Sequence, residues 1–341
     1  MSPLYPRAVW RVLLDGKDLA PALNPRLISL SIRECRGDEA DQLDITLSDH
    51  DGLLEIPPLG ALLAISIGWS HIGLVDKGTF TVDELTHSGT PDIITLRGRS
   101  ADMTSPLRTR TERSFHKKTV KEIVEAVAAD HGLTPVVDPM FAKIKVEHID
   151  QTSESDLAFL NRIGKRYDAV ANVKDGRLVF LVITGARTQN GQQMPLLGLL
   201  RSDGDSHSFQ QVARDSYTGV KAMWLDTRKS KKRSVVVGVL GNAKHLRETY
   251  ANETDALQAA QAEWQRIRRG TASMKFSMAV SRPEMTPQYR VKFLNMKSPI
   301  REIEWLVKSL EHSLDGSGGL RLTLDLEIQE VEEPEGEEEN G

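Results

Sequence analysis

The chain has 341 residues, a single cysteine and few aromatic side chains. Cys35 has no partner for an intrachain disulfide, so a disulfide-stabilised scaffold is excluded and folding in a reducing cytosol is expected. No apolar run reaches the ~18 residues that a membrane-spanning helix requires. The N-terminal segment Met1–Arg7 lacks the charged, apolar and small-residue pattern of a signal peptide. These absences favour a soluble protein without a membrane span.

Motifs that would indicate chemistry are also missing. None of the nine histidines pairs with another at metal-ligand spacing, and there is no Cys-x-x-Cys sequence. A nucleophile elbow, a P-loop and a dinucleotide-binding fingerprint are all absent. Asp49 and Asp51 flank His50, but turn chemistry explains both carboxylates. The sequence therefore predicts no catalytic residue, no metal site, no cofactor and no enzymatic activity.

Charge is unevenly distributed along the chain. The net charge is −4, but residues 327–341 contain eight acidic and no basic side chains. Without that segment, 44 basic and 40 acidic residues remain, a net charge of +4. Residues 330–341 have almost no apolar side chain to bury, and we expect a disordered acidic tail there. This tail could serve as a solubilising end or as a cover for a basic surface.

A basic segment is the one candidate binding site that the sequence offers. Five cations occur within six residues between two expected strands: Arg228, Lys229, Lys231, Lys232 and Arg233. Such a segment is either a solvated hairpin tip or a contact for an acidic protein surface, a nucleic acid or the acidic tail. Aromatic residues are only 5% of the chain and do not interleave with these cations, which argues against nucleic acid. We therefore treat the five residues as a candidate assembly interface.

Residues 1–105 are predicted to be β-rich. The segments Leu27–Ile32 and Leu43–Ser48 alternate apolar and polar residues, as half-buried strands do. Leu62–Trp69 carries an apolar stripe, and two further strands are expected at Thr79–Leu85 and Asp92–Gly98. Short strands separated by turn residues are typical of a barrel or a sandwich.

Residues 106–190 are predicted to form a helix–helix–hairpin domain. Thr119 and Glu122 have the spacing of a capping box at the start of the first helix. The polar segment Ile149–Leu157 is expected to cap and open the second helix, which leads into two strands joined by Lys174-Asp175-Gly176. A third helix is expected from Asn252 to Arg269, and residues 245–285 are expected to complete this domain.

Residues 191–244 and 286–329 are predicted to form a second β-rich domain. Its expected strands are Tyr217–Leu225, Ser234–Leu240, Tyr289–Leu294, Trp305–Leu314 and Leu320–Ile328. The predicted fold class is α+β, with two β-barrel domains and an α/β helix–hairpin domain between them.

Three segments together resemble a known family. They are Leu43–Trp69 with its Pro57-Pro58-Leu59-Gly60 turn, Gln151–Gly176, and Trp305–Thr323. In order and spacing they are similar to the late control protein D family of contractile-tailed phages, the tail or baseplate hub. The architecture is also similar to the N-terminal part of the type VI secretion spike protein. The basic segment and the acidic tail lie outside this resemblance.

The resemblance implies a structural hub and not an enzyme. It implies a homotrimer in which each subunit contributes two tail-tube-like barrels to a pseudo-sixfold ring, adapting a hexameric tail tube to a trimeric central spike. The implied partners are the spike and tube proteins, with the tape-measure protein as a further candidate. The implied location is the virion tail baseplate, after assembly in the host cytoplasm. Two alternatives remain: a hub of a phage-derived secretion or bacteriocin particle, and a peptidoglycan-degrading baseplate enzyme, which needs an extra domain or a Glu/Asp pair in a cleft.

Overall fold

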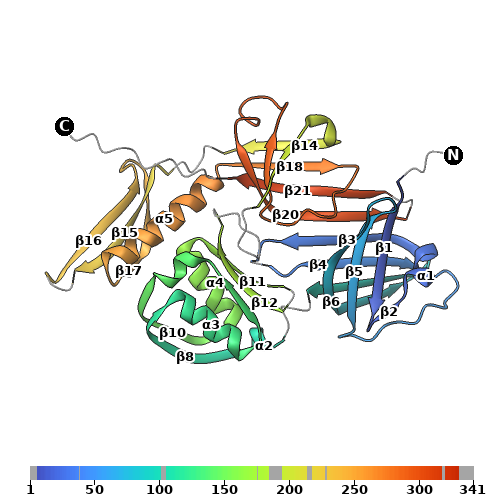
Figure 1. Ribbon diagram of the computed structural model, residues 1–341, viewed down its shortest axis with the longest axis horizontal. Helices are drawn as coiled ribbons and strands as arrows, with labels where there is room; N and C mark the ends of the chain where they lie inside the picture. The colour runs from blue at the N-terminus through green and yellow to red at the C-terminus, as the bar shows by residue number, and fades with distance from the viewer. Residues whose placement is uncertain are drawn as a thin grey trace.

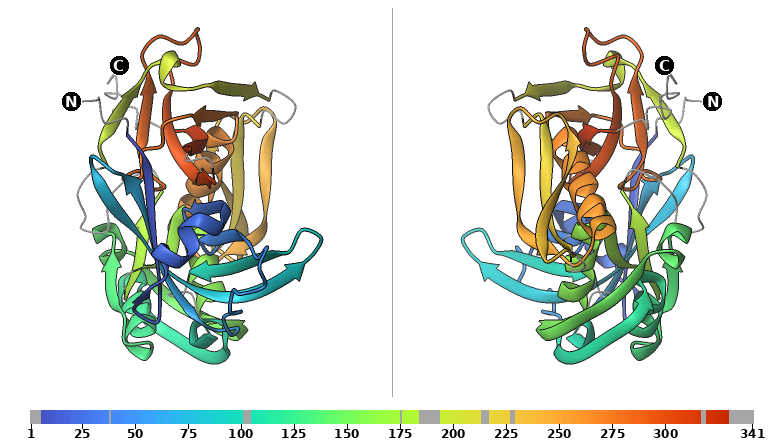
Figure 2. Two further views of the ribbon diagram at one scale, coloured as in Figure 1. Left: turned by 90° about the vertical axis from the view of Figure 1, so that its right-hand side faces the viewer. Right: turned by 90° about the vertical axis from the view of Figure 1, so that its left-hand side faces the viewer.

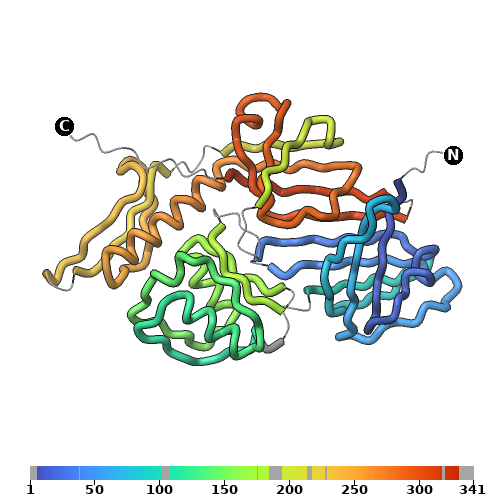
Figure 3. The backbone as a smooth tube through the Cα atoms, viewed as in Figure 1, coloured from blue at the N-terminus to red at the C-terminus, as the bar shows by residue number. Residues whose placement is uncertain are grey.

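The computed structural model describes residues 6–37, 39–100, 105–174, 176–183, 194–212, 217–226, 229–316 and 319–329. This part of the chain is a mixed α and β structure in which strands predominate (Figure 1). The chain runs from a first β unit (blue) through a helical unit (green) and a small unit (yellow to orange). It ends in a second β unit, mostly orange and red (Figure 3).

The first and second β units belong to one 13-stranded sheet. The first unit contributes β1 (Ala8–Leu14), β2 (Lys17–Asp18), β3 (Leu27–Cys35), β4 (Gln42–Ser48), β5 (Leu62–Trp69), β6 (Gly73–Ser88) and β7 (Ile93–Ser100). The second contributes β13 (Leu196–Leu199), β14 (Ser206–Gln211), β18 (Ala272–Met278), β19 (Arg290–Phe293), β20 (Glu304–Asp315) and β21 (Leu320–Ile328). The strand order is β14-β18-β21-β20-β3-β4-β7-β6-β5-β1-β2, and β19 joins β13 to β20.

Antiparallel pairing of β3 with β20 connects the two β units. The register runs from Ser309 opposite Cys35 to Asp315 opposite Ser29. Each unit keeps its own apolar core, with Ile32 and Ile65 in the first and Phe276 and Trp305 in the second. The other expected strands of both units are present, but those expected at Tyr217–Leu225 and Ser234–Leu240 lie outside this sheet, and main-chain hydrogen bonds make the two units one continuous sheet. Sequence periodicity carries no information about this pairing because the two strands lie far apart in the chain.

The helical unit contains the expected helices and hairpin. Its elements are α2 (Ser105–Arg108), β8 (Arg110–Thr119), α3 (Val120–Asp130), β9 (Thr134–Val137), a 3-10 turn (Pro139–Ala142), β10 (Lys145–Ser155), α4 (Asp156–Tyr167), β11 (Ala169–Lys174) and β12 (Arg177–Val182). Thr119 and Glu122 form the predicted capping box, and the Ser155 side chain accepts a hydrogen bond from the Ala158 N–H. Asp168 ends α4 in the left-handed conformation, with φ 52°.

One prediction for this unit was only partly right, because Ser155 caps α4 as expected but the residues before it form a strand. Residues 149–155, expected to be a polar capping segment, lie in β10, which pairs with β8. Both strands are rich in polar side chains, and a polar network described below satisfies several of them. The usual apolar alternation of a strand is therefore weak here, so the sequence pattern did not reveal the pair.

The small unit differs from the predicted domain division. The strands β15 (Gly219–Asp226), β16 (Lys231–Gly238) and β17 (Ala243–Tyr250) form a separate three-stranded sheet, and α5 (Glu253–Arg269) packs against it. The right-hand view of Figure 2 shows α5 lying along these strands. Strand pairing thus separates residues 219–250 from the second β unit, while β18, expected with the helical domain, pairs in the large sheet. The small buried alanines of α5, Ala256 and Ala260, permit its close approach to β15.

Candidate functional site

A buried ionic cluster lies where the first β unit meets the two units beside it. At its centre is Glu34 of β3, whose carboxylate oxygens lie 2.7 Å from Lys77 Nζ and 3.3 Å from Lys174 Nζ. His312 Nε2 of β20 lies 3.6 Å from Glu34 Oε2. Glu34 and Lys77 are 1% and 3% exposed. Lys77 is in β6 and Lys174 in β11, so one carboxylate connects strands of the first β, second β and helical units.

Burial and neighbouring charge together set the ionisation of this cluster. Burial raises the pKa of Glu34, but the His312 imidazole and the charges of Lys77 and Lys174 outweigh it and lower the pKa to about 2. Burial lowers the pKa of Lys77, and it also lowers the pKa of His312. The ionised Glu34 is therefore held by cations on two sides, as expected for a structural contact.

A second ionic cluster fixes α5 to the helical unit and to the large sheet. Arg269, at the end of α5, forms a bidentate contact with Asp168, the residue that ends α4. The same guanidinium lies 3.3 Å from Glu327 of β21, and Glu327 also pairs with Arg36. Arg269 and Asp168 are each 2% exposed. These contacts hold the ends of α4, α5 and β21 together.

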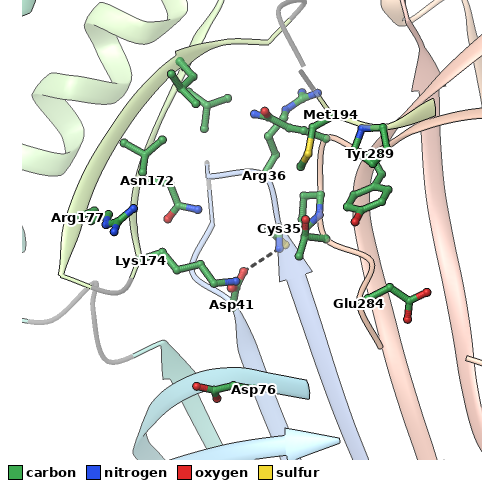
Figure 4. Close-up of a pocket in the computed structure, with 17 residues that line it drawn as sticks. Cys35, Arg36, Asp41, Asp76, Asn172, Lys174, Arg177, Met194, Glu284 and Tyr289 are labelled. Atoms are coloured by element: carbon green, nitrogen blue, oxygen red, sulfur yellow. Dashed lines mark hydrogen bonds between the residues drawn. The ribbon is translucent and has the colours of Figure 1, made fainter. Parts of the chain in front are cut away.

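A cavity of about 590 Å³ opens beside the ionic clusters (Figure 4). It is lined by residues of the first β unit, the β11–β12 hairpin and the segments 194–195 and 284–289. Asp41 accepts a hydrogen bond of 2.8 Å from the Cys35 N–H, and burial raises the pKa of Asp41 to about 6. Two further carboxylates, Asp76 and Glu284, line other walls in Figure 4.

A polar network lies inside the helical unit. Asp156, at the start of α4, is 2% exposed and accepts hydrogen bonds from Gln151 Nε2 at 2.7 Å and from Arg113. His131 Nε2 lies 2.6 Å from the other carboxylate oxygen. Burial raises the pKa of Asp156, but these hydrogen bonds outweigh it and lower the pKa overall. The network joins β8, β10, α3 and α4 and so accounts for the polar strands that the sequence pattern missed.

The Asp49-His50-Asp51 segment forms a turn. Asp49 Oδ1 accepts the Leu54 N–H at 3.0 Å, and the Arg26 guanidinium contacts both aspartates, with a bidentate contact to Asp51. This geometry agrees with the turn interpretation of the sequence.

Four of the five cations in the candidate assembly interface lie at the tip of the β15–β16 hairpin. Lys229 is in the turn, Lys231, Lys232 and Arg233 open β16, and all four are exposed. Arg228 lies outside the described residues, as does the acidic segment 330–341. Arg233 Nε lies 3.1 Å from Asp226, and its guanidinium lies 5.9 Å from the centre of the Trp224 ring. Within the described residues, the three lysines are the other exposed cations of this tip.

A surface that the sequence analysis missed lies on the loop between β4 and β5. Leu53, Ile56 and Leu59 are 74%, 54% and 66% exposed. The loop is nevertheless fixed, because the Gly60 N–H donates to the Val82 carbonyl at 2.8 Å and the Leu54 N–H donates to Asp49. The sequence does contain a signal for this surface: apolar residues surround Pro57 and Pro58 without the periodicity of a helix or a strand, which favours an exposed apolar loop.

Within the described ranges, no three or more His, Cys, Asp or Glu side chains gather as metal ligands. None of the helices in that same part of the chain has the length and apolar character that crossing a membrane requires.

The described part of the chain is thus strand-rich, with ionic clusters that fix its units together, and its class is that of the phage tail proteins to which it is similar. The chain belongs to the phage tail baseplate hub family, whose model matches residues 42–317. It is 37% identical to a probable baseplate hub protein of Escherichia phage 186 and 36% identical to that of Escherichia phage P2. Each alignment covers 94% of this chain and 93% of the relative. The predicted family and its baseplate hub role are confirmed, which places the protein in the virion tail.

Solved structures support the fold. The 43 kDa tail protein of prophage MuSo2 from Shewanella oneidensis matches with a TM-score of 0.68 at 16% identity, covering 93% of this chain and 97% of that one. A type VI secretion system component from Escherichia coli matches with a TM-score of 0.54 at 15% identity, covering 90% of this chain and 74% of that one. At these identities the likeness concerns the fold alone, and it includes a protein of the type VI secretion system, as the predicted similarity expected.

Proposed function

We propose that three copies of this chain form the central hub of a contractile phage tail, between a hexameric tail tube and a trimeric spike. In this proposal each subunit supplies two tail-tube-like β-barrel domains, and the protein carries out no chemistry of its own. Membership of the baseplate hub family is the observation that carries the role.

The continuous sheet supports the symmetry part of the proposal. Two β units with separate cores, joined through β3 and β20, give three subunits six such units. The pairing and the Glu34 cluster fix the two units relative to each other. A subunit of this kind can present one face with approximate sixfold symmetry and still assemble as a trimer.

The exposed surfaces supply candidate contacts for the partners. The loop carrying Leu53, Ile56 and Leu59 offers apolar area, and burying apolar area is the dominant favourable term in most protein–protein association. The hairpin tip with Lys229, Lys231 and Lys232 offers charge, which steers association with an acidic surface. We assign both to assembly contacts with the tube, the spike or the tape-measure protein.

Light scattering of the purified protein mixed with the spike protein from the same phage tests the assembly. The proposal expects a complex with three copies of this chain per spike trimer. A chain that remains monomeric and does not bind the spike at micromolar concentrations refutes it. Isolated chains can be monomeric, because the partner stabilises the assembled state by mass action.

The basic tip is tested by replacing Lys229, Lys231 and Lys232 with serine. Binding to tube or spike should weaken, most strongly at low salt, and the melting temperature should stay within about 2 °C because the side chains are exposed. The matched control replaces Lys143, Lys145 and Lys297, three exposed lysines elsewhere, and removes the same charge. Equal binding by both variants at every ionic strength means that the tip is only a solvated turn.

A further inference from the structure

Two histidines face each other on the outer surface of the helical unit. His116 of β8 and His148 of β10 are directly opposite in the strand register, although they lie 32 positions apart in the chain. Their Nδ1 atoms are 3.0 Å apart, and the rings are stacked with centres 4.5 Å apart and planes 26° apart. Both residues are exposed to solvent.

A carboxylate orients one of these imidazoles. Asp150 Oδ2 lies 2.9 Å from His148 Nε2, and Asp150 Oδ1 accepts a hydrogen bond of 2.5 Å from Ser114 Oγ. Asp150 is a carboxylate within hydrogen-bonding distance of His148 Nε2, so it accepts the Nε2–H of that imidazole. The tautomer that donates from Nε2 leaves the lone pair of His148 Nδ1 directed toward His116.

The geometry matches that of two imidazole ligands on one metal ion. With metal–nitrogen bonds of about 2.0–2.1 Å and an angle between about 90° and 110°, the two nitrogens lie about 2.9–3.4 Å apart. A carboxylate that holds the far nitrogen of a ligating histidine is the usual outer partner in protein metal sites. Without a metal, a single proton must be shared between the two nitrogens, because two lone pairs or two N–H groups repel at 3.0 Å.

We propose that His116 and His148 bind a divalent transition metal ion, of the Zn²⁺, Ni²⁺ or Cu²⁺ class, through their Nδ1 atoms. Imidazole nitrogen is a preferred ligand for these ions, whereas Mg²⁺ and Ca²⁺ prefer oxygen. Water completes the coordination sphere, so the site is open and weaker than a four-ligand structural zinc site. The bound ion connects β8 to β10 close to the irregularity in their pairing between Gln151 and Glu154.

The test is calorimetric titration of the untagged protein with NiCl₂, followed by Cu²⁺ binding monitored by electron paramagnetic resonance. One ion should bind per chain, and the Cu²⁺ spectrum should show coupling to two imidazole nitrogens. His116→Ala and His148→Ala should each weaken Ni²⁺ binding about 100-fold, because each converts a two-point attachment into a one-point attachment. Asp150→Asn should keep the stoichiometry and weaken binding about tenfold, as for other outer partners.

The matched control is His245→Ala, which removes an exposed strand histidine of β17. This variant should bind Ni²⁺ like the wild type. Loss of binding in His245→Ala as large as in His148→Ala, or wild-type affinity in both His116→Ala and His148→Ala, overturns the proposal. Circular dichroism confirms folding of each variant, and His116→Gln replaces His116→Ala if the alanine variant unfolds. A rise in melting temperature with Ni²⁺ in the wild type, absent from His148→Ala, gives a second readout.

Discussion

Replacing Lys77 with methionine removes the most deeply buried cation of the Glu34 cluster while keeping much of the side-chain volume. The carboxylate of Glu34 then loses its contact at 2.7 Å, and the Met285 carbonyl loses the hydrogen bond of 3.2 Å that Lys77 donates. Removing one partner of a buried ion pair typically costs about 3–5 kcal/mol. Lys174 and His312 stay near Glu34, so we expect the lower end of that range.

At about 2.1 cal/mol/K of unfolding entropy per residue, a loss of about 3 kcal/mol in the free energy of unfolding lowers the melting temperature of this 341-residue chain by about 4 °C. Differential scanning calorimetry measures this shift. The matched control is Lys308→Met, which removes an exposed lysine of β20 and should change stability by less than about 0.5 kcal/mol. The double variant Glu34→Gln/Lys77→Met leaves neither charge buried, so it should be less destabilised than the sum of the two single variants.

Two results would refute this reasoning. A Lys77→Met protein that melts within 2 °C of the wild type shows that the cluster does not hold the β units together. Additivity of the two single variants to within about 0.5 kcal/mol shows that Glu34 and Lys77 are not coupled.

Three further predictions concern the pH dependence of stability, the contact of Gly37 with the helical unit, and a helix cap. Because the folded-state pKa of Glu34 is about 2 and its ordinary value is 4.5, its ionised form stabilises the fold above pH 4.5. That contribution, about 3 kcal/mol, is lost as the pH falls from 4.5 to 2, and Glu34→Gln should flatten the pH dependence of unfolding in this range. Gly37→Ala should lower the melting temperature more than Gly16→Ala. Both glycines have positive φ, but only at Gly37 would the added Cβ meet other atoms, because it would lie 2.1 Å from Val170 Cγ1 of β11. Equal melting temperatures of the two variants would contradict this prediction. Thr119→Ala should cost about 1 kcal/mol through loss of the capping box, measured by denaturant unfolding, and no change would show that the cap contributes nothing.

Local signals explain the parts of the fold that sequence patterns predicted well. The Thr119 capping box, the Asn252 cap of α5 and the β11–β12 hairpin depend on residues close together in the chain. Half-buried strands such as β4 were visible because one face is apolar and the other polar. The β8–β10 pair was missed because its buried groups, such as Gln151, are polar and are satisfied by hydrogen bonds from distant positions.

The candidate site was less predictable. The basic segment was found because its charges are consecutive, and the structure places it at an exposed hairpin tip. The Glu34 cluster was not found, because its members come from β3, β6, β11 and β20 and each is an ordinary single charged residue in its own segment. The apolar loop around Leu53 has no periodicity, and only the structure shows that its side chains are exposed.

The sequence by itself determined the local elements, the β-rich ends with helices between them, and the resemblance to tail hubs, because these depend on short-range periodicity, caps, turns and the order of motifs. Only the tertiary structure decided that β3 pairs with β20, that residues 219–250 form their own sheet against α5, and that His116 faces His148. These outcomes depend on main-chain pairing and charge contacts between residues far apart in the chain. No local pattern encodes which distant partner satisfies a given strand edge or buried charge.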